Sequence, residues 1–263
     1  MAEPNPMTDE TLAARFSDKL FGTPDGGASG AKTRLMRVAV QLLADGEPIT
    51  PAQLAAAAGL AEADLRPGSG PLDIEYDELG RIVGWGLTSN ATPHKFTVNA
   101  RRLYTWCAPD TLIFPILIGR IAEVESPCPT TGTIIRLTVD PDAGVTALDP
   151  STAVVSLVDP GQVDPAAVRA TVCDPQHFFA TADAARDWQS RHPGMTVLPV
   201  AEAYTLIMRP LADAFLRDAS PGMNRDRSVS GAWPQDRPPS AGAGPLIEQF
   251  GRPATDGVEH LRG

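Results

Sequence analysis

Two cysteines and one aspartate are the residues of this 263-residue chain that are best suited to chemistry. Cys107 stands three residues before Asp110 in "RRLYTWCAPDTLIFPILIGR", and Cys173 opens "CDPQHFFATADAARDW". Residues three apart in a helical turn share a face, so we expect this thiol and this carboxyl to lie side by side. A strand predicted over residues 168–173 would present Cys173 at its end, just before a turn at 174–175, a common place for a reactive side chain.

The residue types limit the chemistry. Thiolates are soft ligands that select soft metal ions, whereas a carboxylate is hard and adds little to such a site. A structural zinc site needs four ligands at short spacings, and here it would have to recruit Cys128 and His177. A redox disulfide motif would need a cysteine where Asp110 stands. The carboxyl is therefore better suited to donating a proton. The alternative for each cysteine is a purely structural role, because free cysteines often only pack in a core.

The apolar run from Leu112 to Ile118 follows these residues directly. We expect it to exclude water from both the thiol and the carboxyl. Desolvation and a neighbouring thiolate both raise the pKa of an aspartic acid above its usual ~3.9, which suits a proton donor near neutral pH. Trp106 is a candidate for the wall of the same pocket, although an aromatic beside a core helix more often only packs.

Composition and charge exclude several classes of protein. The formal net charge is −10, which argues against a nucleic-acid partner because phosphate binding needs a basic patch. No apolar run reaches the roughly 18 residues of a membrane span, and the first residues lack the basic and apolar pattern of a secretory signal. Three widely spaced cysteines do not form a disulfide framework. We therefore predict a cytoplasmic protein with reduced thiols and no membrane partner.

The first helices and their caps are predicted from local signals. Apolar residues on one helical face predict a helix over residues 35–43 that stops at Gly46. A second helix begins in "TPAQLAAAAGL", with Thr50 as N-cap, Gln53 completing a capping box and Gly59 as the C-terminal glycine.

A hairpin follows in "IEYDELGRIVGWGLT", turning at residues 78–80, with Val83, Trp85 and Leu87 alternating onto one face. The order of elements is that of a winged helix-turn-helix. However, the recognition helix would begin near Ala61, in "AEADLRPGSGPLD", which holds one basic residue, two prolines and two glycines. So short a helix, with almost no Arg or Lys, cannot fill a major groove or neutralise phosphates, and we therefore predict a scaffold or lid rather than a DNA reader.

The remaining elements mix strands and helices. Strands are predicted over 133–140, 152–158 and 168–173, and helices over 181–192 and 200–217. The last helix is expected to kink at Pro210. Without a regular alternation of strand and helix, the fold class is α+β, with a winged-helix-like module and hairpin preceding a mixed catalytic core.

Composition then divides the chain into four segments. We predict a flexible leader (1–31), the winged-helix-like module (32–100), the catalytic α+β domain (101–218) and a disordered tail (219–263) rich in proline and glycine.

Both cysteine-bearing segments resemble the signature segments of the bacterial organomercurial lyases, also called alkylmercury lyases. Residues 32–217 are similar to that family in the order of their elements. The resemblance implies that Cys107, Cys173 and Asp110 are the catalytic set and that Cys128 is structural. The chain departs from some members at Asp174, where they carry a further cysteine, so an auxiliary thiol for passing on the metal is missing here.

The resemblance also implies the reaction. An alkyl- or arylmercury compound would be captured by the thiols, and protonolysis by Asp110 would release a hydrocarbon and leave Hg(II) bound to Cys107 and Cys173. No cofactor is expected, but an external thiol would release the product, and Hg(II) would pass to a mercuric reductase or to small thiols as part of mercury detoxification. The alternative is a mercury-sequestering or metal-sensing winged-helix protein without lyase activity, against which the presence of Asp110 weighs.

Overall fold

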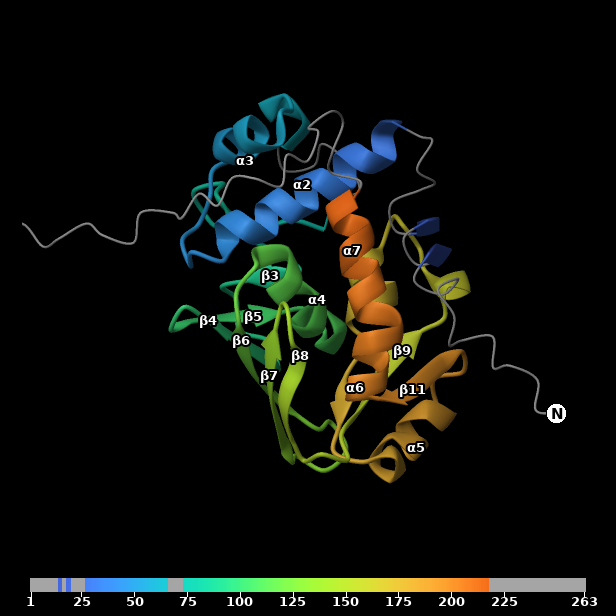
Figure 1. Ribbon diagram of the computed structural model, residues 1–263. Coiled ribbons are helices and arrows are strands. Elements are labelled where there is room, and N and C mark those ends of the chain that lie inside the picture. The colour runs from blue at the N-terminus through green and yellow to red at the C-terminus, as the bar shows by residue number, and fades with distance from the viewer. Residues whose placement is uncertain (1–13, 16–17, 20–26, 66–72, 218–263) are drawn as a thin grey trace, which may run out of the picture. The chain divides into compact units, whose positions relative to one another are not determined.

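The computed structural model describes residues 14–15, 18–19, 27–65 and 73–217 (Figure 1). The predicted tail and most of the predicted leader lie outside these residues. The elements discussed below all belong to one compact unit of the chain.

The main sheet has eight strands in the order β1-β2-β3-β5-β4-β6-β7-β8, and all neighbouring pairs are antiparallel. Its strands are β1 Glu75–Tyr76, β2 Ile82–Trp85, β3 Leu87–Thr88, β4 His94–Val98, β5 Arg101–Thr105, β6 Ala122–Pro127, β7 Ile134–Asp140 and β8 Gly144–Asp149. A smaller sheet, β10-β9-β11, is made of β9 Val154–Val158, β10 Phe178–Phe179 and β11 Met195–Pro199. Together with the helices below, these sheets confirm the α+β class.

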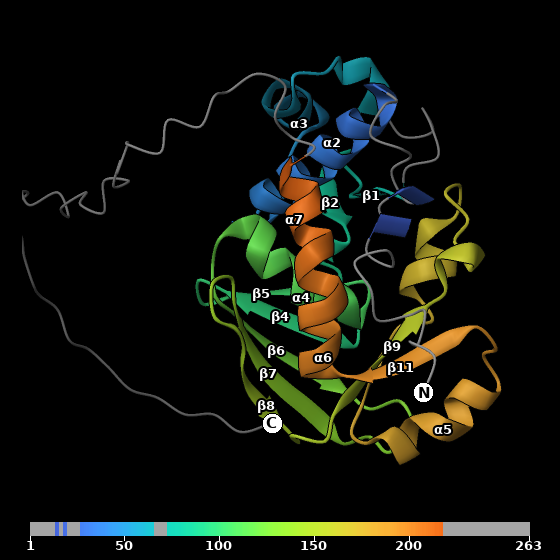
Figure 2. The same cartoon turned by 45° about the vertical axis from the view of Figure 1, so that its right-hand side comes forward.

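The helical elements are α2 Gly27–Leu43, α3 Pro51–Ala58, η1 Glu62–Leu65, α4 Ala108–Ile118, η2 Pro160–Gln162, η3 Arg169–Cys173, α5 Ala182–Ser190, α6 Val200–Ala203, η4 Tyr204–Met208 and α7 Arg209–Arg217. Helices α2, α4 and α7 contact one another, and Figures 1 and 2 show α7 running beside α4 towards α2. Helix α4 also contacts strands β4, β5, β6 and β7 of the main sheet, so it lies at the centre of the core.

The N-terminal helices form as their sequence signals predict. Thr50 caps α3 by accepting from the Gln53 backbone, the Gln53 side chain accepts from Thr50 in return, and Gly59 ends the helix at φ 69°. Helix α2 begins at Gly27, before the boundary expected at residue 32. The third predicted helix is the single 3-10 turn η1, and the residues 66–72 that follow it lie outside the described part of the chain.

The predicted hairpin forms between β1 and β2 and turns at residues 77–80. It does not continue to Thr88 as one strand. The chain reverses at Gly86, whose φ is +75°, so that β2 pairs with β3 instead of running into it. Side chains on both faces of β2 are buried, which removes the expected alternation between a buried and an exposed face. A side chain at Gly86 would also meet the ring of Phe114 in α4, at 2.7 Å, so glycine permits both the reversal and the close approach.

The strand predicted over residues 168–173 is wrong, because residues 169–173 form the π-helical turn η3. The β-branched residues there suggested a strand, but Thr171 makes helical contacts instead. Its backbone N–H and its hydroxyl both donate to the carbonyl of Ala167 four residues back, at 3.0 and 2.8 Å. Cys173 therefore ends a helical turn rather than a strand.

The last predicted helix forms as α6, η4 and α7 in succession. Its irregularity lies in the π-helical segment η4, just ahead of Pro210. Proline has no N–H to donate to a carbonyl four residues back, and its ring crowds that carbonyl, so the helix widens before it. The helix predicted over residues 181–192 is confirmed as α5, which spans Ala182–Ser190 with Thr181 as its N-cap.

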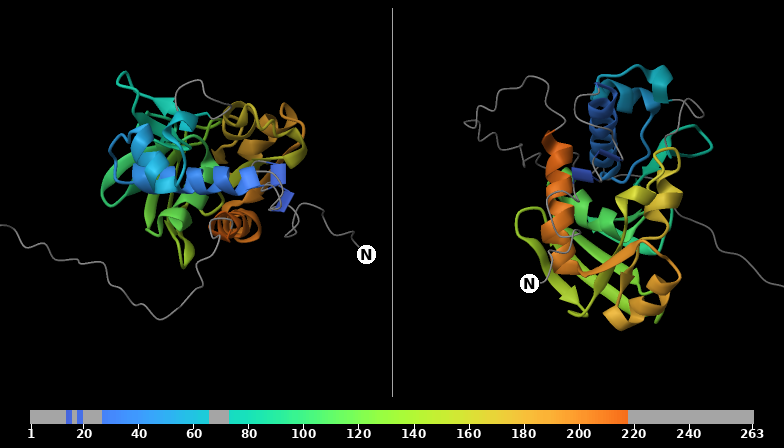
Figure 3. Two further views of the ribbon diagram at one scale, coloured as in Figure 1. Left: turned by 90° about the horizontal axis from the view of Figure 1, so that it is seen from above. Right: turned by 90° about the vertical axis from the view of Figure 1, so that its right-hand side faces the viewer.

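The boundary expected between residues 100 and 101 falls in the turn of a hairpin. Asn99 and Ala100 both have positive φ values, and the strands on either side of them, β4 and β5, pair with each other. Strand β4 also pairs with β6, so the main sheet takes strands from both of the predicted segments. Figure 3 shows this shared sheet from two further directions.

Candidate active site

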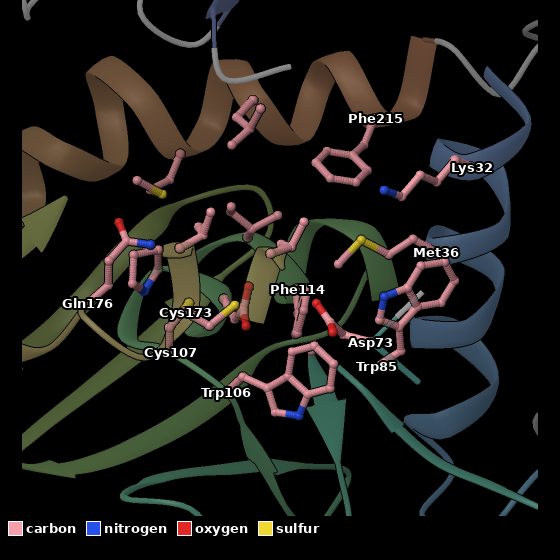
Figure 4. A pocket seen from close by; sticks show the side chains of 18 residues that line it. Lys32, Met36, Asp73, Trp85, Trp106, Cys107, Phe114, Cys173, Gln176 and Phe215 are labelled. Atoms are coloured by element: carbon pink, nitrogen blue, oxygen red, sulfur yellow. The ribbon is translucent and has the colours of Figure 1, made fainter. Parts of the chain in front are cut away.

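The structure brings Cys107, Asp110 and Cys173 together. The two sulfur atoms and a carboxylate oxygen of Asp110 all lie within 4.8 Å of one another. Cys107 is the N-cap of α4, with extended backbone (φ −140°, ψ 168°), and Asp110 lies in the first turn of that helix. Cys173 comes from η3, and Figure 4 shows its side chain next to that of Cys107. The helical turn expected for Cys107 and Asp110 is thus present.

Gln176 connects the two segments that carry the thiols, and sequence reasoning missed it. Its backbone N–H donates to the carbonyl of Cys173 at 3.0 Å, and its own carbonyl accepts from the backbone of Ala108 at 3.2 Å. Its side-chain oxygen accepts a hydrogen bond from Val158 N–H at 3.2 Å. This bond orients the amide group so that its nitrogen faces the pocket. The turn after Cys173 is therefore fixed against the start of α4.

Burial controls the protonation of Asp110. The residue is only 9% exposed, and its Oδ2 has no hydrogen-bond partner among the described residues. Desolvation raises the pKa of Asp110 from 3.8 to about 7, although hydrogen bonds from the side chain and backbone of Cys107 act in the opposite direction. Near neutral pH this carboxyl can therefore both accept and donate a proton.

Both thiols are free and buried, with Cys107 1% and Cys173 6% exposed. Burial raises the pKa of Cys107 well above its ordinary value, and its hydrogen bond to Cys173 and the charge of Asp110 add to this. The hydrogen bond from Cys107 lowers the pKa of Cys173, but burial and the charges of Asp110 and Asp174 outweigh it, so the pKa of Cys173 is raised as well. Both side chains are therefore protonated thiols until a soft metal ion displaces the proton.

The three groups open into a cavity of about 90 Å³ (Figure 4). Its walls are mostly apolar and aromatic, and include Met36, Trp85, Trp106, Phe114, Met208 and Phe215. Trp106 lines this pocket, as the sequence suggested. The wall is built from α2, α4, η4 and α7 as well as the β2–β3 reversal, so it combines segments from both ends of the chain.

Arg169 and Glu75 connect η3 to the first hairpin. The Arg169 guanidinium pairs with the Glu75 carboxylate and lies over the Trp106 ring, 4.7 Å from its centre. The Trp106 indole N–H also donates to Glu75, at 3.1 Å. The backbone N–H of Arg169 donates to Asp73 at 2.9 Å. These contacts hold the segment that carries Cys173 against the residue before Cys107.

The other candidates from the sequence lie outside this cluster. Among the described residues, the only group with ligand atoms close enough to share a metal ion is Cys107, Asp110 and Cys173, so Cys128 and His177 do not complete a zinc set. Cys128 is buried in the turn between β6 and β7, where its backbone pairs with Thr133 and Gly132. Within the described part of the chain, no helix is both long and apolar enough to cross a membrane.

Comparisons with known proteins cover residues 11–211 and point to one protein family. Residues 87–211 match the alkylmercury lyase family, and residues 11–86 match the helix-turn-helix domain of alkylmercury lyase. An alkylmercury lyase of Streptomyces lividans is 50% identical over 215 residues, covering 81% of this chain and 97% of the relative. One of Staphylococcus epidermidis is 44% identical over 194 residues, covering 73% and 88%.

A solved structure, described as the mercury-bound form of MerB2, is similar in fold. Its TM-score is 0.62 at 20% sequence identity, and the match covers 78% of this chain and 99% of that one. The likeness supports the fold, while the sequence matches carry the family assignment. This chain belongs to the alkylmercury lyase family.

Proposed function

We propose that the chain cleaves the carbon–mercury bond of alkyl- and arylmercury compounds by protonolysis, with Cys107, Asp110 and Cys173 as its catalytic residues. One observation carries the assignment of roles. Two thiols and a carboxyl with a pKa of about 7 lie within 4.8 Å of one another, at the end of a pocket whose walls are mostly apolar. Soft sulfur ligands suit mercury, and a partly protonated acid suits delivery of a proton to carbon.

Capture of the substrate comes first. A thiol forms a sulfur–mercury bond, its proton leaves with the substrate's former counter-ligand, and the organic group stays attached to mercury. Cys173 is the better suited of the two for this step, since it is the more exposed and receives the hydrogen bond from Cys107. The apolar walls accommodate the alkyl or aryl group.

The second thiol then adds. Asp110 in its ionised form accepts the proton of Cys107, and the resulting thiolate binds the same mercury. This thiol is on the N-cap residue of α4 and the carboxyl is in the first turn, so the two groups are neighbours within 4.8 Å of each other. The extra sulfur donation weakens the bond between mercury and carbon.

Protonolysis completes the reaction. Asp110 delivers the proton it has just received to the carbon, the electron pair of the carbon–mercury bond becomes the new carbon–hydrogen bond, and the hydrocarbon leaves. Mercury(II) stays bound to two sulfurs, and Asp110 is again a carboxylate. Over the cycle, two thiol protons leave, one with the counter-ligand and one in the hydrocarbon.

The product requires an acceptor. We propose that Hg(II) leaves on small thiols or on a mercuric reductase and that the enzyme needs no cofactor. The cytoplasm is the fitting compartment, because the mechanism depends on reduced thiols. The winged-helix-like module serves here as a wall of the pocket, to which α2 contributes Met36, and not as a DNA reader.

The test is a single-turnover assay with phenylmercury or methylmercury, measuring benzene or methane in the gas phase and mercury on the protein. The wild type releases one hydrocarbon for each Hg(II) retained. Asp110→Asn binds the organomercurial but releases little hydrocarbon. Normal turnover by this variant would refute the proton-donor role, and binding without cleavage by the wild type would favour a sequestering protein.

A further inference from the structure

Besides the catalytic groups, the cavity has two ionisable side chains in its lining, Lys32 and Asp73. Lys32 comes from α2, and Asp73 precedes β1. Figure 4 shows Lys32 at the end of the pocket near Phe215, away from Cys107 and Gln176. The mechanism proposed above uses neither residue. A cation in the lining of a mostly apolar pocket has a desolvation cost, which calls for an explanation.

Asp73 has a structural partner, whereas Lys32 has no ion-pair partner among the residues that the structure describes. Asp73 accepts a hydrogen bond from the backbone of Arg169 at 2.9 Å and so helps to hold η3. Lys32 forms no ion pair within the part of the chain that the structure describes. Burial lowers the pKa of Lys32, and the charge of Asp73 opposes this without forming a contact pair. Lys32 therefore stands half-buried in the lining of the pocket, with no ion-pair partner among the described residues.

The positive charge of Lys32 indicates which class of ligand it can bind. An ammonium group repels an organomercury cation and Hg(II), so it does not serve to attract mercury itself. It attracts anions. Apart from the counter-ligand that leaves with the first proton, the anion from outside is the thiolate that must enter to take Hg(II) away from Cys107 and Cys173.

We propose that Lys32 is the receiving site for the anionic thiol that removes Hg(II), and that the preferred acceptors are small thiols carrying a carboxylate. This proposal rests on the proposed function, because it takes Hg(II) on two cysteines as the product. In the exchange, two acceptor thiolates form two new sulfur–mercury bonds as the bonds to Cys107 and Cys173 break, and the two cysteines take up the two protons that the acceptor thiols released on ionising. No atom changes its oxidation state.

Lysine fits this role physically. The carboxylate of an incoming thiol loses water as it enters a mostly apolar pocket, and a fixed cation at the far end offsets that cost. The apolar stem of Lys32 can pack along the pocket wall while the amine meets the anion. The thiol group of the same molecule then points towards the mercury, because the sulfurs and Lys32 stand at opposite ends of one cavity (Figure 4).

The test uses three thiols of similar size but different charge: mercaptoacetate (anionic), 2-mercaptoethanol (neutral) and cysteamine (cationic). Protein loaded with one equivalent of Hg(II) is mixed with each thiol at low ionic strength and at matched thiolate concentration. The loss of the ultraviolet absorption of the mercury–thiolate bonds gives a second-order rate constant. We expect Lys32→Met to slow removal by mercaptoacetate about tenfold, to leave 2-mercaptoethanol unchanged and to speed removal by cysteamine.

Two further variants control the experiment. Lys32→Arg keeps the charge and should preserve the order of the three thiols. Lys95→Met removes an exposed lysine on β4, paired with Glu125 and absent from the pocket lining, and should change nothing. Equal effects of Lys32→Met on all three thiols, or no effect on any, would overturn the proposal. Because Hg(II) is loaded directly, this outcome is independent of hydrocarbon release, whose absence would refute the proposed function instead.

Discussion

Asp110→Asn should make the protein inactive yet more stable at neutral and alkaline pH. A carboxyl whose pKa rises from 3.8 to about 7 on folding is destabilising once it is ionised, by about 4 kcal/mol in total. The sign follows from the raised value: the folded state holds the proton more tightly, so this contribution is fully favourable below pH 3.8 and is lost as the pH rises through about 7. Because Asp110 is only 9% exposed, solvent screening reduces this figure little.

The measurement is urea unfolding of the wild type and of Asp110→Asn at several pH values between 5 and 8. Asparagine carries no charge at any of them, so the difference between the two proteins isolates the carboxyl. We expect the free energy of unfolding of the wild type to fall, relative to the variant, by about 3 kcal/mol over this range. Parallel curves for the two proteins would show that Asp110 is not held protonated by burial, and the account of its acid role would fail with them.

Three further predictions concern other parts of the chain. Burial and repulsion from His177 lower the pKa of His94 to about 3. Because the unfolded state then binds the proton more tightly, the free energy of unfolding falls as the pH drops below 6.5. His94→Gln should therefore lose about 2 kcal/mol less than the wild type between pH 6.5 and 4.5 in urea unfolding. In thermal unfolding, Gly86→Ala should destabilise the protein by about 2–4 kcal/mol, because its φ is positive and a side chain would lie 2.7 Å from Phe114. Gly80→Ala, which has a similar φ but open space around it, should cost about 1–2 kcal/mol. Under limiting iodoacetamide, peptide mapping should find Cys173 labelled before Cys107, and the reverse order would contradict the assigned order of capture.

Local signals in the sequence predicted the elements whose stabilising contacts are themselves local. The capping box of α3 requires only Thr50 and Gln53, three residues apart, and both hydrogen bonds form. The pairing of Cys107 with Asp110 is of the same kind, since a helix start brings residues three apart together. The capping of α3 and the proximity of Cys107 to Asp110 could therefore be predicted without a structure.

Elements stabilised from a distance were predicted less well. The segment 169–173 has the β-branched residues of a strand, but its helical turn is stabilised by Asp73, 96 residues away, which accepts from the backbone of Arg169. The boundary placed after residue 100 followed a change in composition. Pairing of β4 with both β5 and β6 overrides it, because the hydrogen bonds of a sheet do not depend on composition.

The residues that complete the pocket could not be predicted for a different reason. Sulfur and carboxyl chemistry restricts which residue types can bind mercury or donate a proton, so Cys107, Asp110 and Cys173 are recognisable by type. Nothing about a lysine in α2 or a glutamine after Cys173 singles it out in the sequence. Only the fold places Lys32 and Gln176 in the lining of the same cavity. A group whose role comes from its position alone must be identified by its effect on a ligand, and a series of thiols differing only in charge measures that effect for Lys32.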